Sequence, residues 1–242
     1  MAFRALVEYD GTDYHGFQRQ REEPTIQGEL EAALVEITGE QVSVIGAGRT
    51  DSGVHATGQV IAFEVSWRHD CQALERALNA TLPGAIAVRA LQEAATGFHP
   101  RFSAKSRVYT YTIDTGPVRR PLNRLNAWYV PRQLQVVLMN QAAQAIVGRH
   151  DFATFGQPPQ GVNTEREVFN AEWREQEELL RFEIEANAFL YRMVRSLVGS
   201  MKAVGEGRWT VTDFVAALAS RDRSRAAQTA PPHGLCLTAV HY

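Results

Sequence analysis

The sequence predicts an α+β fold in which one β-α-β-β-α-β unit occurs twice. Amphipathic segments with helical spacing alternate with short strand-like runs, and the order is the same in both halves of the chain. Because one supersecondary unit is used twice, we expect an N-terminal unit at residues 1–104 and a C-terminal unit at residues 105–242. With 242 residues, the chain is long enough to bury a substantial core.

The first unit begins with a strand-like run and an amphipathic helix. Thr25 is the expected N-cap of that helix, and Gly39 is expected to end it. The expected elements, in order, are a strand at 3–9, a helix at 25–39, strands at 42–46 and 58–66, a helix at 71–83 and a strand at 86–94.

The second unit repeats this order with little repeated sequence. Its expected elements are a strand at 107–115, a helix at 134–148, strands at 166–175 and 179–189, a helix at 190–205 and a strand at 235–242. An extra helix at 211–220 precedes the last strand, and residues 116–131 form a long loop of the kind that often carries function.

Composition narrows the class of protein. Two distant cysteines, Cys71 and Cys236, indicate neither a disulfide framework nor a zinc site, and they fit a reducing cytoplasm. The first residues do not resemble a secretion signal, and no apolar run reaches the roughly 18 residues of a membrane span. A net charge of −2 argues against a uniformly basic nucleic-acid-binding surface. A polyanionic ligand would therefore have to bind a locally basic patch.

The most distinctive stretch is the turn GAGRTDSGVH, residues 46–55, with Asp51 at its tip. It fails as a dinucleotide fingerprint because Asp51 stands where the third glycine belongs and a strand follows. It lacks the Lys-Ser/Thr pair of a phosphate loop, and His55 alone is a poor metal-ligand set. An ordinary hairpin, with its glycines in unusual backbone conformations, stays open as the alternative.

Several motifs, in order, resemble one enzyme family. They are YDGTDYHGFQRQ, TIQGELEAAL, GAGRTDSGVHATGQV, FHPRFSAKSRVYTY, GRHDFATF, TEREV, ANAFLYRMVRSLVGSMKAVGEGRW and APPHGLCL. Together they resemble the tRNA pseudouridine synthase A (TruA) family nearly end to end. The resemblance implies two ferredoxin-like or RRM-like units joined in one extended, mostly antiparallel sheet, with helices on one face and a central RNA-binding cleft.

The resemblance also implies a reaction and its residues. The family isomerises uridine to pseudouridine at positions 38, 39 and 40 of the tRNA anticodon stem-loop, acts as a homodimer, and uses the aspartate that corresponds to Asp51. It assigns Arg195 to an ion pair with this aspartate, Tyr109 to the catalytic site and Leu235 to an apolar pocket wall. Nothing is oxidised or hydrolysed in this isomerisation, which agrees with a sequence that shows no cofactor motif and no metal-ligand set.

The residues themselves are compatible with these roles. A carboxylate in a pocket of low dielectric needs a nearby cation to stay ionised, and Arg195 lies in a mostly apolar helix; the alternative is an arginine whose head group reaches solvent. Tyr109 and Tyr111 alternate on a strand and point the same way, so one of them could stack on a flipped base; otherwise both are half-buried sheet residues. Arg49 could fill the gap that a flipped nucleotide leaves, bind the phosphate of that nucleotide, or be a solvated turn residue.

Basic residues recur in clusters that could follow an RNA backbone. They are Arg19 and Arg21; Arg101, Lys105 and Arg107; Arg119, Arg120 and Arg124; and Arg221, Arg223 and Arg225. The main rival is a non-catalytic RRM-like RNA-binding protein, which is disfavoured because the strand at 58–66 lacks the basic-Gly-aromatic pattern of such proteins. A third class, a nucleotide-dependent oxidoreductase, is disfavoured because the turn at residues 46–55 does not match the dinucleotide-binding fingerprint.

Overall fold

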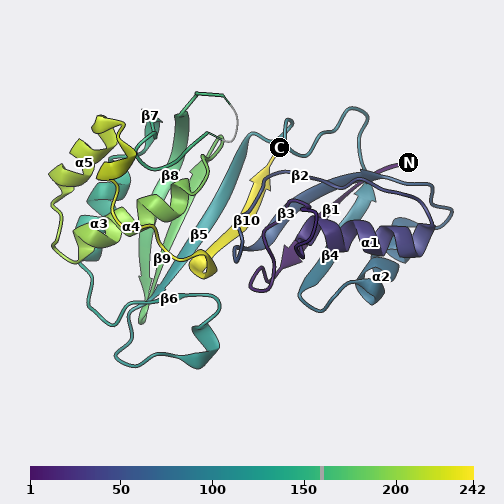
Figure 1. The fold of residues 1–242 in the computed structure, drawn as a ribbon, viewed down its shortest axis with the longest axis horizontal. Helices are drawn as coiled ribbons and strands as arrows, with labels where there is room; N and C mark the ends of the chain where they lie inside the picture. Colours follow the sequence, from purple (N-terminus) through teal and green to yellow (C-terminus); the bar gives the residue numbers. More distant parts are fainter. Residues whose placement is uncertain (159–160) are drawn as a thin grey trace. The chain divides into compact units, whose positions relative to one another are not determined.

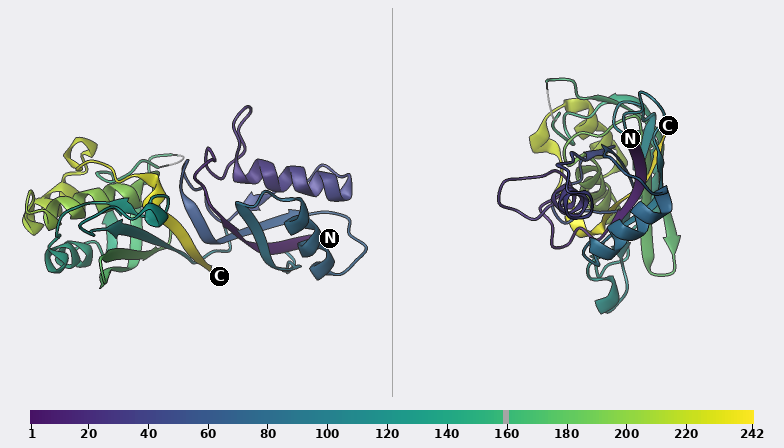
Figure 2. Two further views of the ribbon diagram at one scale, coloured as in Figure 1. Left: turned by 90° about the horizontal axis from the view of Figure 1, so that it is seen from below. Right: turned by 90° about the vertical axis from the view of Figure 1, so that its right-hand side faces the viewer.

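The computed structural model describes residues 1–158 and 161–242, which form two units (Figures 1 and 2). One unit comprises residues 1–105 together with 236–242, and the other comprises residues 106–235. Both combine a mostly antiparallel sheet with helices, so the predicted α+β class is confirmed. Within the described residues, no helix is both long enough and apolar enough to cross a membrane.

The first unit has its strands in the order β4-β1-β3-β10. Its elements are β1 (Ala2–Tyr9), α1 (Ile26–Thr38), β2 (Ile45–Gly46), β3 (His55–Glu64), α2 (Cys71–Thr81), β4 (Ile86–Glu93) and β10 (Leu235–His241). Alternate residues of β1, such as Phe3 and Val7, are buried, whereas Leu6 on the opposite face is exposed. Strand β1 therefore has one buried face and one more exposed face, and helices α1 and α2 contact each other, with α2 also packed against β4.

The second unit has the strand order β5-β9-β8-β7, with β6 paired in parallel to β5. Its elements are β5 (Ser106–Asp114), β6 (Trp128–Tyr129), α3 (Val136–Gln144), β7 (Gly148–Asp151), β8 (Glu165–Gln176), β9 (Leu179–Ala186), α4 (Met193–Gly205) and α5 (Val211–Ser220). Trp173 and Phe182 stack in the core, and α5 packs against α3 and α4. The predicted extra helix at 211–220 is confirmed.

Four segments differ from the sequence prediction. The strand expected at 42–46 is reduced to two residues, because the N–H of Val44 donates to Glu31 Oε1 on α1 at 3.0 Å and its carbonyl accepts from Gln27. The helix expected from residue 190 begins at Met193, because Arg192 has a left-handed φ of 60°. The short strands β6 and β7 were not predicted.

The last strand also differs from the simple repeat pattern. That pattern placed residues 235–242 with the second unit, whereas β10 pairs in parallel with β3, with Cys236 opposite His55 and Leu237 opposite Ala56. Gly58 allows this pairing, because a Cβ at its position would lie 2.1 Å from the carbonyl oxygen of Thr238.

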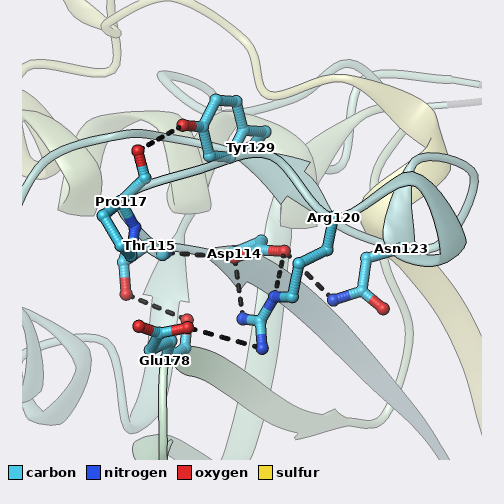
Figure 3. A network of polar contacts seen from close by, with 8 residues as sticks. Asp114, Thr115, Pro117, Arg120, Asn123, Tyr129 and Glu178 are labelled. Atoms are coloured by element: carbon cyan, nitrogen blue, oxygen red, sulfur yellow. Dashed lines mark hydrogen bonds and ion pairs between the residues drawn. The ribbon is translucent and has the colours of Figure 1, made fainter.

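A buried carboxylate anchors the long loop between β5 and β6 (Figure 3). Asp114 is only 1% exposed and accepts two hydrogen bonds from Arg120, at 3.0 and 2.8 Å, and one from Asn123 at 3.0 Å. The Gly116 N–H donates to it as well, at 3.1 Å. Hydrogen bonds from Arg120, the largest cause, hold the pKa of Asp114 at about 2, against the opposing effect of burial.

We predict that Asp114→Asn lowers the free energy of unfolding at pH 7 by about 2 kcal/mol. Because the folded-state pKa lies below the unfolded value, this stabilisation is complete above about pH 5 and is lost as the pH falls toward 2. Urea denaturation of wild type and variant at several pH values between about 3 and 7 measures the difference, which should shrink in acid.

Glu178→Gln is the matched control for this prediction. Glu178 is half exposed and lies 3.6 Å from the same guanidinium, so its loss should cost less than about 0.5 kcal/mol. Equal unfolding midpoints for wild type and Asp114→Asn at pH 7 would contradict the anchoring role of Asp114.

Candidate active site

Asp51 lies half-buried in a loop between β2 and β3 that is held at both ends. At the first end, the buried side chain of Gln59 bonds both the N–H and the carbonyl of Gly48, at 3.3 and 2.9 Å. At the other end, Gly53 has a φ of +74° and the N–H of Val54 donates to the Asp51 carbonyl at 3.1 Å. The loop is therefore a defined turn that fixes the direction of the Asp51 backbone.

The segment from Tyr9 to Phe17 supports this turn from one side. The Thr50 carbonyl accepts from the Phe17 N–H at 3.1 Å, and the Tyr9 hydroxyl bonds the Thr50 hydroxyl at 2.8 Å. The Tyr14 carbonyl accepts from the Gly53 N–H at 3.3 Å. Residues immediately before and after Asp51 are thus bonded to one neighbouring segment.

Two glycines make this close approach possible. A Cβ at Gly11 would lie 2.1 Å from the carbonyl oxygen of Val54, and one at Gly16 would lie 2.7 Å from that of Thr50. Gly16 also has a φ of +93°, a conformation that other residues rarely adopt. Sequence reasoning did not single out these glycines, although both lie in the motif YDGTDYHGF.

His55 joins the same segment to the start of β3. Its Nδ1 atom accepts from the Gly11 N–H at 3.0 Å and lies 3.1 Å from Asp10 Oδ1. Burial raises the pKa of Asp10, but hydrogen bonds from Thr12 and the nearby imidazole outweigh it, so the pKa lies below its usual value. His55 therefore has a structural role beside the Asp51 turn.

Arg195 lies in the first turn of α4 in the second unit and is half-buried. Its Nε atom donates to the Ala230 carbonyl at 2.8 Å, and the Ala230 N–H donates to the Arg195 carbonyl at 3.0 Å. The arginine is thereby fixed by both its helix and the loop at residues 226–231.

Small residues on α4 allow the loop at residues 226–231 to pack closely against this helix. A Cβ at Gly199 would lie 1.8 Å from the carbonyl oxygen of Gln228, and the Ser200 hydroxyl accepts from the Ala227 N–H at 3.2 Å. Arg223 bonds the hydroxyls of Ser196 and Thr229, at 3.1 and 3.2 Å. Spacings of three and four residues between Ser196, Gly199 and Ser200 were the available sequence signal for this contact.

The two tyrosines of β5 are buried and share one face, as predicted. Tyr109 packs edge-on against Phe189, with ring centroids 4.9 Å apart. The Tyr111 hydroxyl donates to the Pro231 carbonyl at 2.9 Å, and burial raises the pKa of Tyr111. Tyr111 thus holds the segment that leads to Leu235, which is also buried.

The predicted residues divide between the two units. Asp51 and the exposed Arg49 belong to the first unit, and Tyr109 and Arg195 belong to the second. Leu235, the first residue of β10, is the last residue of the second unit. Several arginines of the basic clusters make structural contacts instead of facing solvent alone; these are Arg19 with Glu31, Arg107 with the Asn187 carbonyl, Arg120 with Asp114, and Arg223 with Ser196. Among the residues described, no group of three or more acidic, histidine or cysteine side chains is arranged to hold a metal ion.

Comparison with known sequences identifies the family. A family profile described as tRNA pseudouridine synthase matches residues 5–103 and 142–242. The chain belongs to the tRNA pseudouridine synthase family. The predicted membership of this isomerase family is confirmed, and the matched residues include the turn of Asp51 and the motif of Arg195.

Individual relatives of the family match over nearly the whole chain. The "tRNA pseudouridine synthase A" of Roseiflexus castenholzii is 45% identical over 242 residues, covering 98% of this chain and 88% of that protein. The proteins of the same name from Pseudothermotoga lettingae and Sinorhizobium medicae are 41% and 42% identical, and each comparison covers 99% of both chains.

We predict that Gly16→Ala abolishes most of the catalytic activity of the folded enzyme. A Cβ at Gly16 must displace the backbone at Thr50 and with it the direction of Asp51, in addition to the strain of a positive φ, which costs about 1–3 kcal/mol. We expect kcat to fall by roughly 100-fold, since the family resemblance gives Asp51 the catalytic role and small misplacements of a catalytic group have effects of this size.

Gly97→Ala is the matched control, because Gly97 has a φ of +78° but no atom within 4 Å of the added Cβ. It should lose a similar amount of stability from strain and keep its activity. Activity is measured well below the melting temperature of each variant. A Gly16→Ala enzyme with the kcat of Gly97→Ala would contradict the role assigned to this contact.

Proposed function

We propose that this protein converts uridine to pseudouridine in tRNA, at positions 38, 39 and 40 of the anticodon stem-loop, with Asp51 as the catalytic carboxylate. The family match and the relatives that bear this name support the reaction and the substrate class. The observation that carries the role of Asp51 is its placement on a turn whose two flanks are bonded to residues 9–17. Such preorganisation is what a single catalytic side chain requires.

The reaction needs little beyond a carboxylate and a shaped pocket. The C1′–N1 bond of uridine breaks, the uracil turns, and its C5 joins C1′; the proton lost from C5 is balanced by one gained at N1. No electrons are exchanged, so no redox cofactor is required. In our proposal the ionised Asp51 acts at the reacting nucleotide, and the surrounding side chains hold the detached base.

The remaining site residues have complementary roles in this proposal. Arg195 pairs with Asp51 and keeps it ionised, and the anchoring of Arg195 by the Ala230 carbonyl supports a fixed position for its charge. Tyr109 packs against the base, and Leu235 forms an apolar wall of the pocket. The exposed guanidinium of Arg49 binds a phosphate near the target nucleotide.

We further propose that the enzyme acts in the cytoplasm as a homodimer. Its two cysteines, Cys71 and Cys236, are both free thiols, which suits a reducing compartment. The dimer rests on the family resemblance.

We predict that Asp51→Asn lowers tritium release from tRNA labelled at uridine C5 by about 1,000-fold or more, with tRNA affinity retained. The amide has nearly the same shape but cannot act as an anion. Asp13→Asn, which removes an exposed carboxylate from the neighbouring segment, is the control and should keep wild-type activity. Undiminished release by Asp51→Asn would remove Asp51 from its role, and no release by the wild type would favour the non-catalytic RNA-binding alternative.

The proposed ion pair makes a separate prediction about the chemical step. Arg195→Lys keeps a positive charge but loses the planar donor that bonds the Ala230 carbonyl, so we expect kcat/KM to fall by roughly tenfold or more. The loss should lie in kcat and not in KM, because the pair holds the reacting carboxylate and not the tRNA.

Arg208→Lys is the control for a general effect of replacing an arginine in this unit. Arg208 is exposed, lies just after α4 and pairs with Glu206, so its replacement leaves the loop at residues 226–231 and the contacts of Arg195 unchanged. Its kcat should therefore match that of the wild type. If Arg195→Lys and Arg208→Lys gave the same kcat, Arg195 would be a structural residue only.

A further inference from the structure

The segment from Thr115 to Gln135 has an unusual charge for this chain. It contains Arg119, Arg120, Arg124 and Arg132 and has no Asp or Glu, although the whole protein has a net charge of −2. A local surplus of arginine without interspersed acids is typical of a surface that meets a polyanion.

The structure separates Arg120 from the other three arginines of this segment. Arg120 turns back to the buried Asp114 (Figure 3), which it contacts at 2.8 Å, and lies 3.6 Å from Glu178. Its charge is therefore compensated within the fold. Arg119, Arg124 and Arg132 are exposed, and within the described residues the Arg124 guanidinium donates only to the Pro121 carbonyl of its own turn, at 3.3 Å.

The same anchor fixes the shape of the loop that presents them. Asn123 donates to Asp114, the Tyr129 hydroxyl donates to the Pro117 carbonyl at 3.3 Å, and residues 121–123 form a short 3₁₀ helix. Residues 116–126, which we name the arginine loop, are thus tied to the sheet near their start and middle. A loop ordered in advance loses little conformational entropy when it binds a ligand.

We propose that the arginine loop binds the sugar–phosphate backbone of the tRNA substrate, with Arg119 and Arg124 contacting phosphates. This inference rests on the proposed function, because that function makes tRNA the polyanion. Guanidinium groups match phosphate oxygens in a bidentate manner, and such contacts set position without reading sequence. Leu122, which is 90% exposed on the same loop, lies beside these two arginines in the sequence and packs against the ribose surface of the bound strand.

The contact is expected to affect binding and not the chemical step. The test compares wild type with Arg119→Gln/Arg124→Gln, using unmodified tRNA and filter binding at several salt concentrations between about 50 and 300 mM. Because two phosphate contacts are lost, the slope of log K against log salt should decrease by about 1.5–2. KM should rise roughly tenfold at about 100 mM salt, with kcat within about twofold of wild type.

Arg149→Gln/Arg174→Gln is the matched control. It removes the same formal charge from the second unit, at arginines that are exposed and paired with Glu165 and Glu172. Its salt slope and KM should stay at the wild-type values. A general effect of net charge would weaken both double variants equally and would overturn the assignment to the arginine loop.

Two further outcomes would also overturn the proposal. An unchanged salt slope in Arg119→Gln/Arg124→Gln would show that the loop does not meet phosphates. A change in the sedimentation coefficient of this variant with unchanged tRNA affinity would assign the loop to a protein contact. The binding assay needs no turnover, so it tests this inference separately from the proposed function. If the protein bound tRNA through this loop but formed no pseudouridine, the proposed function would be refuted and the inference about the loop would stand.

Discussion

The structure of the candidate site depends on the close approach of two backbone segments, residues 11–16 and residues 50–54. Gly11 and Gly16 have no Cβ, so carbonyl oxygens of the Asp51 turn occupy the space that a side chain would fill. Main-chain hydrogen bonds from Phe17 and Gly53 then connect the segments. The orientation of Asp51 is consequently set by backbone contacts, which are stiffer than contacts between flexible side chains.

The second unit uses the same device around Arg195. Gly199 lets the loop at 226–231 approach α4, and Gly234 lies against the ring of Tyr111. Bonds from Ser200, Arg223 and Arg195 itself then hold the loop in place. In both units a glycine creates the space, and polar groups satisfy the carbonyls and N–H groups that the approach buries.

Two buried carboxylates, Glu31 and Asp114, compensate the charge of two arginines of this chain within the fold. Glu31 and Asp114 each accept from an arginine and from a backbone N–H, namely Arg19 and Val44 for Glu31, and Arg120 and Gly116 for Asp114. Each therefore fixes an irregular segment to a helix or a strand. A charge count from the sequence does not distinguish an arginine that is paired with a buried carboxylate from an unpaired one. Only the contacts in the structure make this distinction.

The sequence by itself determined the features that depend on neighbouring residues. Thr25 caps α1 and Gly39 ends it in a left-handed conformation, and the extra helix at 211–220 has its predicted bounds, because caps and amphipathic spacing act within a few residues. The turn of Asp51 and the family resemblance could also be identified from the sequence. Tertiary structure alone decided the parallel pairing of β10 with β3, the left-handed Arg192 and the support of Asp51 by residues 9–17. The strand pairing and the support of Asp51 arise from contacts between segments distant in the chain, and such contacts leave no pattern among neighbouring residues.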